Sequence, residues 1–124
     1  MPLEFFGIRH VHLVVSDQAR SVAFYQEAFG MEIMFTKDDI VFLCSPGQRD
    51  DLALHQASSD EERARVGQPG GVDHFGITLI DRSRLPDAVN QVVAAGGQLV
   101  RSGEHAPGVP FAYVSDPDGY VIEV

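Results

Sequence analysis

The sequence predicts an α+β fold in which two paired βαβββ modules form a cupped, mostly antiparallel sheet with helices on its outer face. Two observations predict it. A histidine, an apolar strand pattern and an aspartate seven residues further on occur at His10 to Asp17 and again at His74 to Asp81. Each copy is followed by one helical pattern and three short strand patterns. Such repetition indicates two copies of one structural unit.

The first module is expected over residues 5–57, and its first strand over residues 8–15. Val11, Leu13 and Val15 share one face of that strand, because side chains alternate with a period of two. His10 lies on the opposite face. The strand is therefore expected to bury the face that carries Val11, Leu13 and Val15 and to present His10 on the opposite face.

A helix over residues 18–29 follows, with Ser16 or Asp17 as its N-cap and Gly30 as its stop. Three more strands complete the module, at residues 32–36, 40–44 and 52–56. Residues 57–70 are polar and contain two adjacent glycines at their end, which predicts a linker between the modules.

The second module is expected over residues 72–124. Its first strand covers residues 74–81, and apolar residues from Leu85 to Val92 predict a helix that ends at Gly96. Its remaining strands are expected at residues 98–101, 109–114 and 120–124.

The last strand carries a carboxylate in an apolar setting. Asp116-Pro117-Asp118-Gly119 predicts a tight turn before the strand, and Glu123 then stands between Ile122 and Val124. A buried carboxylate needs a partner. If each helix covers the apolar face of its own sheet, Glu123, His10 and His74 all point into the opposite, concave face. These three residues are the candidate site.

Size and charge limit the kinds of partner. The 124 residues suit a single domain over residues 1–124. A formal net charge of −9 predicts repulsion of nucleic acid and of anionic membrane surfaces. Cys44 is the only cysteine, which fits a reducing compartment, and we expect a cytoplasmic protein that acts on a small molecule.

The repeat, the segment Phe24-Tyr25 leading to Gly30, and the ending from Asp116 to Glu123 together resemble the vicinal oxygen chelate superfamily. That superfamily includes glyoxalase I, fosfomycin-resistance transferases, bleomycin-binding proteins and extradiol dioxygenases. The resemblance implies a divalent metal ion in the concave face, with His10, His74 and Glu123 as its ligands. Fe²⁺ or Mn²⁺ is favoured, and Zn²⁺ or Ni²⁺ is also compatible. A homodimer is implied too, and the site lies either within one chain or between two.

The chemistry of these ligands agrees with the resemblance. Two neutral imidazoles and one carboxylate fill part of a coordination sphere and leave adjacent positions open. Two neighbouring oxygens of a small organic substrate can chelate the metal there, which then acts as a Lewis acid. The sequence therefore predicts a metal-dependent enzyme.

Three reaction classes stay open, and dioxygenase-like chemistry is narrowly favoured. Tyr113 stands ten residues before Glu123, as a tyrosine does in extradiol dioxygenases, and His105 is expected in a preceding loop that can close over the site. Where those enzymes have an acid-base histidine, this chain has Asp50-Asp51. Tyr113, His105 and His55 are the catalytic candidates.

A glyoxalase-like lyase or isomerase is the first alternative. Glyoxalase I has a fourth glutamate ligand in the strand matched by residues 52–56, and Ala53 stands at that position. His55, two residues further and on the same face, can substitute as a ligand or carry a proton. The second alternative is a non-catalytic binding protein of the bleomycin-sequestering kind. The presence of all three ligand types disfavours it.

Overall fold

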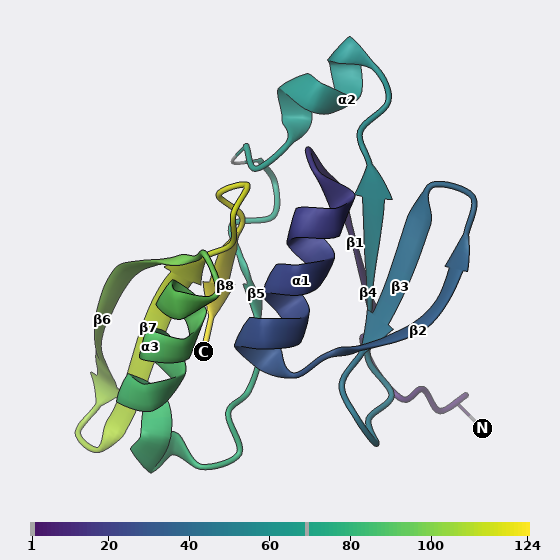
Figure 1. Ribbon diagram of the computed structural model, residues 1–124. Helices are drawn as coiled ribbons and strands as arrows, with labels where there is room; N and C mark the ends of the chain where they lie inside the picture. The colour runs from purple at the N-terminus through teal and green to yellow at the C-terminus, as the bar shows by residue number, and fades with distance from the viewer. Residues whose placement is uncertain (1, 69) are drawn as a thin grey trace.

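The computed structural model describes residues 2–68 and 70–124 and confirms an α+β fold built from two βαβββ units (Figure 1). The strands form two four-stranded sheets, one from each unit, and the sheets do not pair with each other in the described chain. In each sheet the first strand pairs in parallel with the last strand of its unit, and all other pairs are antiparallel.

The first unit matches the expected elements closely. It contains β1 (His10–Val15), α1 (Gln18–Phe29), β2 (Glu32–Lys37), β3 (Ile40–Cys44) and β4 (Asp51–Gln56), in the sheet order β1-β4-β3-β2. Asp17 is the N-cap of α1 and accepts a hydrogen bond from the backbone of Arg20, while Gly30 ends the helix with a φ of 67°. Leu13 and Val15 are buried and His10 is exposed, so the predicted strand faces are confirmed.

The expected linker contains a helix, α2 (Asp60–Arg65). Ser59 caps it by accepting a hydrogen bond from the backbone N–H of Glu62, and the Glu62 side chain accepts hydrogen bonds from Ser58 in return. This reciprocal pair is a capping box in form, displaced by one residue. The segment between the units is therefore partly helical, and its acidic run Asp60-Glu61-Glu62, which from the sequence suits either a helix start or a linker, opens the helix.

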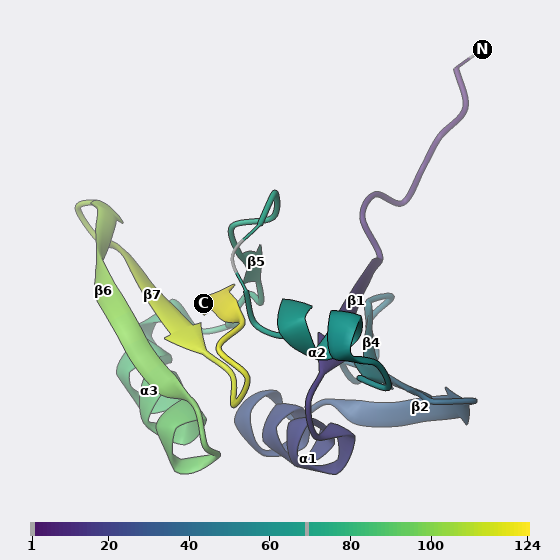
Figure 2. The same cartoon turned by 90° about the horizontal axis from the view of Figure 1, so that it is seen from above.

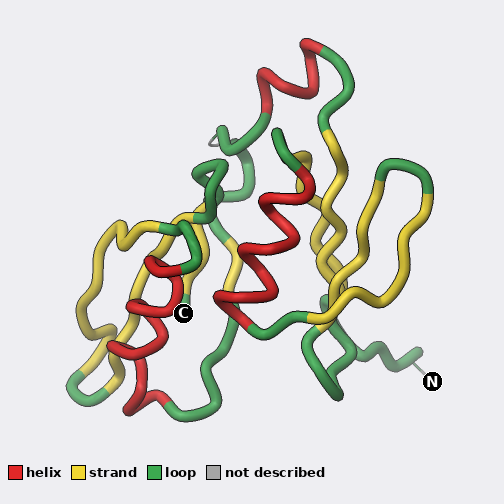
Figure 3. Tube along the Cα trace, in the orientation of Figure 1, coloured by secondary structure: helices red, strands yellow, loops and turns green. Residues whose placement is uncertain are grey.

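The second unit differs from expectation at its first strand. It contains β5 (Phe75–Gly76), η1 (Arg82–Arg84), α3 (Leu85–Ala94), β6 (Gln98–Ala106), β7 (Val109–Ser115) and β8 (Val121–Glu123), in the order β5-β8-β7-β6. The expected strand over residues 74–81 is reduced to β5, which lies between two long loops (Figure 3). Because β8 ends at Glu123, the chain beyond Ile77 has no strand to pair with.

The long helices α1 and α3 lie on the same side of the two sheets and contact each other (Figures 1 and 2). Phe24 and Tyr25 of α1 are buried together with Val92 of α3 and with apolar residues from both sheets, so one hydrophobic cluster spans both units. The chain before β1 runs away on the side opposite the helices (Figure 2). The face of the sheets that bears the histidines is left uncovered by either long helix.

The turn before β8 fastens the second unit to the first. The Asp116 carboxylate is buried and accepts hydrogen bonds from the Tyr25 hydroxyl (2.8 Å) and from the backbone of Asp118 and Tyr120 (2.9 Å each). Asp118 in turn accepts hydrogen bonds from Ser16 and from Arg20 (2.8 Å) of the first unit. Burial raises the pKa of Asp116, and its three donors oppose that shift.

No helix among the described residues is long and apolar enough to cross a membrane.

Replacing Asp116 by alanine should lower the free energy of unfolding by about 3–5 kcal/mol, because one buried and two half-buried donors lose their acceptor together. Tyr25→Phe removes one of these bonds and should cost about 1–2 kcal/mol. Urea denaturation followed by circular dichroism measures both. Glu27→Ala, on the exposed side of α1, is the control and should change stability by less than about 0.5 kcal/mol. Equal stabilities of Asp116→Ala and the control would refute this role of the turn.

Candidate functional site

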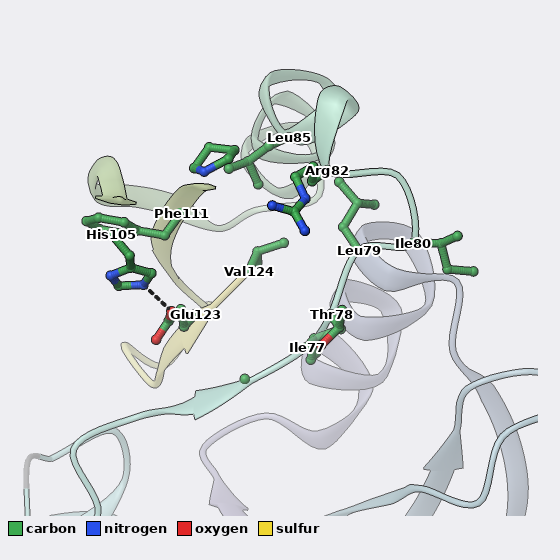
Figure 4. A pocket seen from close by; sticks show the side chains of 12 residues that line it. Ile77, Thr78, Leu79, Ile80, Arg82, Leu85, His105, Phe111, Glu123 and Val124 are labelled. Carbon is green, nitrogen blue, oxygen red and sulfur yellow. Dashed lines mark hydrogen bonds and ion pairs between the residues drawn. The ribbon is translucent and has the colours of Figure 1, made fainter. Parts of the chain in front are cut away.

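Glu123 is the centre of a polar cluster on the exposed face of the second sheet. Nε2 of His74 lies 3.0 Å from its Oε1, and Nε2 of His105 lies 2.8 Å from its Oε2. Figure 4 shows the His105 contact at the wall of a pocket. Tyr113 is the register partner of Glu123 across β7 and β8, and its ring meets the His74 ring edge to face at 4.8 Å. Two histidines and one tyrosine thus surround one carboxylate.

The strand pairing explains why these side chains meet. Ile122 is fully buried, so the alternation of β8 turns Glu123 to the other face. The antiparallel pairing of β7 with β8 then places Tyr113 directly beside Glu123 on that face. In the parallel pairing of β5, Gly76 is opposite Glu123, and His74 precedes Gly76 by two residues, so both belong to the same face.

The expectation that His105 belongs to a mobile loop was wrong. β6 extends to Ala106 and forms a hairpin with β7, which turns at Gly108 with a φ of 80°. The His105 ring stacks on Phe111 with ring centroids 4.2 Å apart. His105 is therefore fixed in the wall of the site by the sheet itself.

The first sheet carries a second group of histidines. His10 Nδ1 contacts the carboxylate of Asp51, its register partner in β4. His12 Nε2 lies 3.3 Å from Nδ1 of His55, and Nε2 of His55 lies 3.2 Å from Glu62 of α2. Burial, with the neighbouring His55 and His10, lowers the pKa of His12. His55 thus contacts His12 and Glu62, in the unit that does not contain Glu123.

The fourth-ligand position of β4 has no acid. Ala53 is fully buried opposite His12 and Phe42 in the strand register. Asp51, two residues earlier, is the carboxylate that contacts His10. Extradiol dioxygenases are expected to have their acid-base histidine at this position. In this chain the position carries Asp51 instead.

The three predicted ligands divide into two groups. His74 and Glu123 meet in the second sheet, whereas His10 belongs to the first. Within residues 2–68 and 70–124, no three histidine, cysteine, aspartate or glutamate side chains are arranged to hold a metal ion. Both β1 and β5 have one edge that pairs with no other strand of the described chain. A further strand can therefore add at the β1 edge of the first sheet and at the β5 edge of the second.

The types of side chain present fit a divalent metal. Nδ1 of His10 contacts Asp51 and Nδ1 of His74 lies 2.7 Å from Asp73, so Nε2 is the nitrogen that would coordinate a metal in both. Hydrogen bonds lower the pKa of Glu123, and the one from His105 has the largest effect. Glu123 is therefore ionised at neutral pH. Imidazole nitrogen and carboxylate oxygen suit Fe²⁺, Mn²⁺, Zn²⁺ and Ni²⁺.

The pocket beside Glu123 has a volume of about 410 Å³. His105, Phe111 and Leu85 line it, and the guanidinium of Arg82 points into it beside Val124 (Figure 4). A wider hollow of about 1000 Å³ lies between the C-terminal end of α1, α3 and residues 76–81. The smaller pocket has the size of a small organic molecule.

The sequence reasoning missed three residues near the site. Asp51 and Asp73 hold the two predicted histidine ligands, and the Arg101 guanidinium lies 4.8 Å above the Tyr113 ring. Burial, with the nearby Glu123, raises the pKa of Tyr113 and keeps its hydroxyl protonated. Asp73 could have been found from the sequence because it directly precedes His74. Asp51 and Arg101 depend on strand registers that no local pattern specifies.

Comparison with known proteins connects both units to one family. The model of the Glyoxalase/Bleomycin resistance protein/Dioxygenase superfamily matches residues 7–124. A lactoylglutathione lyase of Neisseria meningitidis is 31% identical over 124 residues, covering 92% of this chain and 86% of that protein. A catechol-2,3-dioxygenase of Bacillus subtilis is 31% identical over 120 residues, covering 94% of this chain and 40% of that protein.

Among solved structures, a glyoxalase-related enzyme from Fulvimarina pelagi aligns with a TM-score of 0.76 and 26% identity, over 96% of this chain and 86% of that one. The similarity therefore extends over both sheets.

The pKa of His74 should lie above the ordinary 6.5, chiefly because Asp73 hydrogen-bonds its Nδ1. Asp73→Ala should lower it, since the protonated ring loses its main partner. Titration of the His74 Cε1–H signal by ¹H–¹³C NMR measures the shift. Asp87→Ala removes an equal charge from an exposed site on α3 and should leave the titration unchanged. A His74 pKa at or below 6.5 in the unsubstituted protein would contradict the assignment.

Proposed function

Because the chain belongs to the Glyoxalase/Bleomycin resistance protein/Dioxygenase superfamily, we propose that it is a divalent-metal-dependent enzyme that acts on a small organic substrate through two adjacent oxygens. His10, His74 and Glu123 are the proposed ligands. The observation that carries the proposal is the meeting of His74 Nε2 and Glu123 Oε1 at 3.0 Å beside an open pocket. When the proton shared by Nε2 and the carboxylate leaves, the imidazole and the carboxylate at that spacing would form two adjacent corners of a coordination sphere.

The proposed enzyme is a homodimer in which His10 of one chain joins His74 and Glu123 of the other. Two features support this arrangement. β1 and β5 each have an unpaired edge, and unpaired edges are sites where a second chain can add. The segment before β1 also exposes large apolar side chains that a monomer would normally cover. These are Leu3, Phe5, Phe6 and Ile8, which are 83 to 98% exposed.

His10, His74 and Glu123 would hold the metal, which would supply a Lewis acid for the substrate oxygens. The chain's own residues supply orientation and proton handling. Tyr113, protonated at neutral pH, donates a hydrogen bond from its hydroxyl to a substrate oxygen. His105 holds or moves a proton at Nε2, since stacking on Phe111 keeps its ring at the pocket wall. Phe111 and Leu85 exclude water from the substrate.

We favour a dioxygenase-like reaction. The three-ligand set, with Ala53 buried where a fourth glutamate would stand, and the grouping of Tyr113 and His105 at Glu123 support this choice. His55 is the proposed proton carrier of the first unit in this reaction, and it acts through its contact with His12. Fe²⁺ or Mn²⁺ is the proposed metal. The lyase alternative is kept because a lactoylglutathione lyase is 31% identical over nearly the whole chain.

A mixed dimer tests the shared site directly. Co-expression of a His10→Ala chain and a Glu123→Ala chain, each with its own affinity tag, yields a heterodimer that has one complete and one doubly defective site. We expect about half as much metal per chain as in the unsubstituted protein, measured by plasma mass spectrometry. Each homodimeric variant should bind the metal weakly.

If each site lay within a single chain, both sites of the heterodimer would lack a ligand. The heterodimer would then bind as little metal as the two homodimeric variants. Substitution of Glu27 by alanine, on the outer face of α1, is the control and should keep full metal content. An unsubstituted protein that binds no divalent metal after reconstitution would move the chain to the non-catalytic binding class.

Oxygen dependence separates the two reactions. The Fe²⁺-loaded protein should consume O₂ when catechol is the trial substrate, followed with an oxygen electrode. Tyr113→Phe should lower the rate at least about tenfold, because a donor to the reacting oxygens is lost. Formation of lactoylglutathione from methylglyoxal and glutathione under argon would instead establish the lyase, and conversion of catechol under argon would exclude a dioxygenase.

A further inference from the structure

Asp51 is placed to orient His10. It opens β4, and the parallel pairing with β1 makes the two residues register partners. The Asp51 side chain is only 9% exposed and its Oδ1 contacts His10 Nδ1. Its other charged contact, to Nε of the largely exposed Arg9 at 3.5 Å, is long. An ion pair with an exposed arginine contributes little, so the imidazole is the principal partner of this nearly buried carboxylate.

The second unit repeats the same contact from a different place in the sequence. Asp73 Oδ2 lies 2.7 Å from His74 Nδ1. Asp73 is the residue before His74, whereas Asp51 is 41 residues after His10. The Asp73 side chain is 94% exposed in the chain, in contrast to that of Asp51. Carboxylates from two different places in the sequence, Asp51 and Asp73, thus contact Nδ1 of the two corresponding histidines.

A carboxylate at Nδ1 decides the tautomer of a neutral imidazole when no second carboxylate competes at Nε2, which is the arrangement of His10 but not of His74. It accepts a hydrogen bond only from a protonated nitrogen, so the proton stays on Nδ1 and the lone pair stays on Nε2. The bond also fixes the rotation of the ring. A metal ligand held in this way needs no rearrangement before it coordinates, and loss of such a partner lowers metal affinity about 10- to 100-fold.

We propose that Asp51 and Asp73 are positioning residues for a divalent metal. Asp51 holds His10 in the Nδ1–H tautomer and so presents its Nε2, whereas Asp73 fixes the rotation of the His74 ring, whose Nε2 faces Glu123. The inference rests on the proposed function, since it concerns the proposed ligands. In the proposed dimer, Asp51 of one chain and Asp73 of the other act on the same metal ion. Asp51 has the larger effect, because water competes less for a buried acceptor.

The test is a titration of the metal-free dimer with Co²⁺, followed by visible absorption. Asp51→Ala should weaken Co²⁺ binding about 10- to 100-fold. Asp51→Asn retains an uncharged acceptor and should recover part of that loss, and Asp73→Ala should have a smaller effect. Asp50→Ala is the matched control: Asp50 is the neighbouring acid, but its carboxylate is held by Ser45 at 2.6 and 2.8 Å and should not affect the affinity.

The tautomer gives a readout that loss of stability alone would not change. Long-range ¹H–¹⁵N spectra of the metal-free protein, at a pH where the rings are neutral, should show His10 as the Nδ1–H form. In Asp51→Ala the Nε2–H form should predominate, and Asp50→Ala should retain the original spectrum.

The results separate this inference from the proposed function. If the unsubstituted protein binds Co²⁺ and Asp51→Ala binds it equally well with an unchanged tautomer, the positioning role is wrong and the metal site stands. If the unsubstituted protein binds no Co²⁺, the proposed metal function fails, and the positioning role fails with it.

Discussion

The buried carboxylate of Asp116 is the constraint on which the position of the site depends. It gathers the Tyr25 hydroxyl of α1 and two backbone amides of its own turn, while Asp118 reaches Ser16 and Arg20 at the start of α1. The Tyr120 hydroxyl adds a hydrogen bond to the backbone of Val14 at 2.6 Å. A turn of the second unit is thereby fixed against the first strand and helix of the other unit. β8 begins two residues after this turn, so the turn also fixes where Glu123 emerges.

The same architecture leaves each half of the candidate site incomplete. Both sheets bury one face against α1 and α3 and present histidines on the other. Each sheet begins with a strand that has one unpaired edge, and the two ligand groups are carried by or beside these strands. In the proposed homodimer, a second chain would cover the backbone groups at an open edge and the apolar side chains of the segment before β1. The same second chain would complete the set of proposed metal ligands.

Charge in the second unit is organised around Glu123. Two imidazoles and a tyrosine contact or border the carboxylate, and their hydrogen bonds keep it ionised in a chain whose net charge is −9. The contacts of the first sheet are single ones: Asp51 contacts His10, and Glu62 of α2 contacts His55. The second unit has a contact of this kind as well, between Asp73 and His74.

The sequence by itself determined the βαβββ repeat, the superfamily, the buried faces of β1 and β8, and the caps of α1, because alternation, helical spacing and turn residues act over a few neighbouring residues. It singled out Tyr113 by its spacing of ten residues before Glu123, while the register that makes them neighbours comes from the structure. It did not determine the shortness of β5, the place of His105 in β6 or the contact of Asp51 with His10. Only the tertiary structure decided these, because each depends on where a distant strand ends or how a parallel pair is aligned. Local residues leave such alignments open, and the packing of both units around one core sets them.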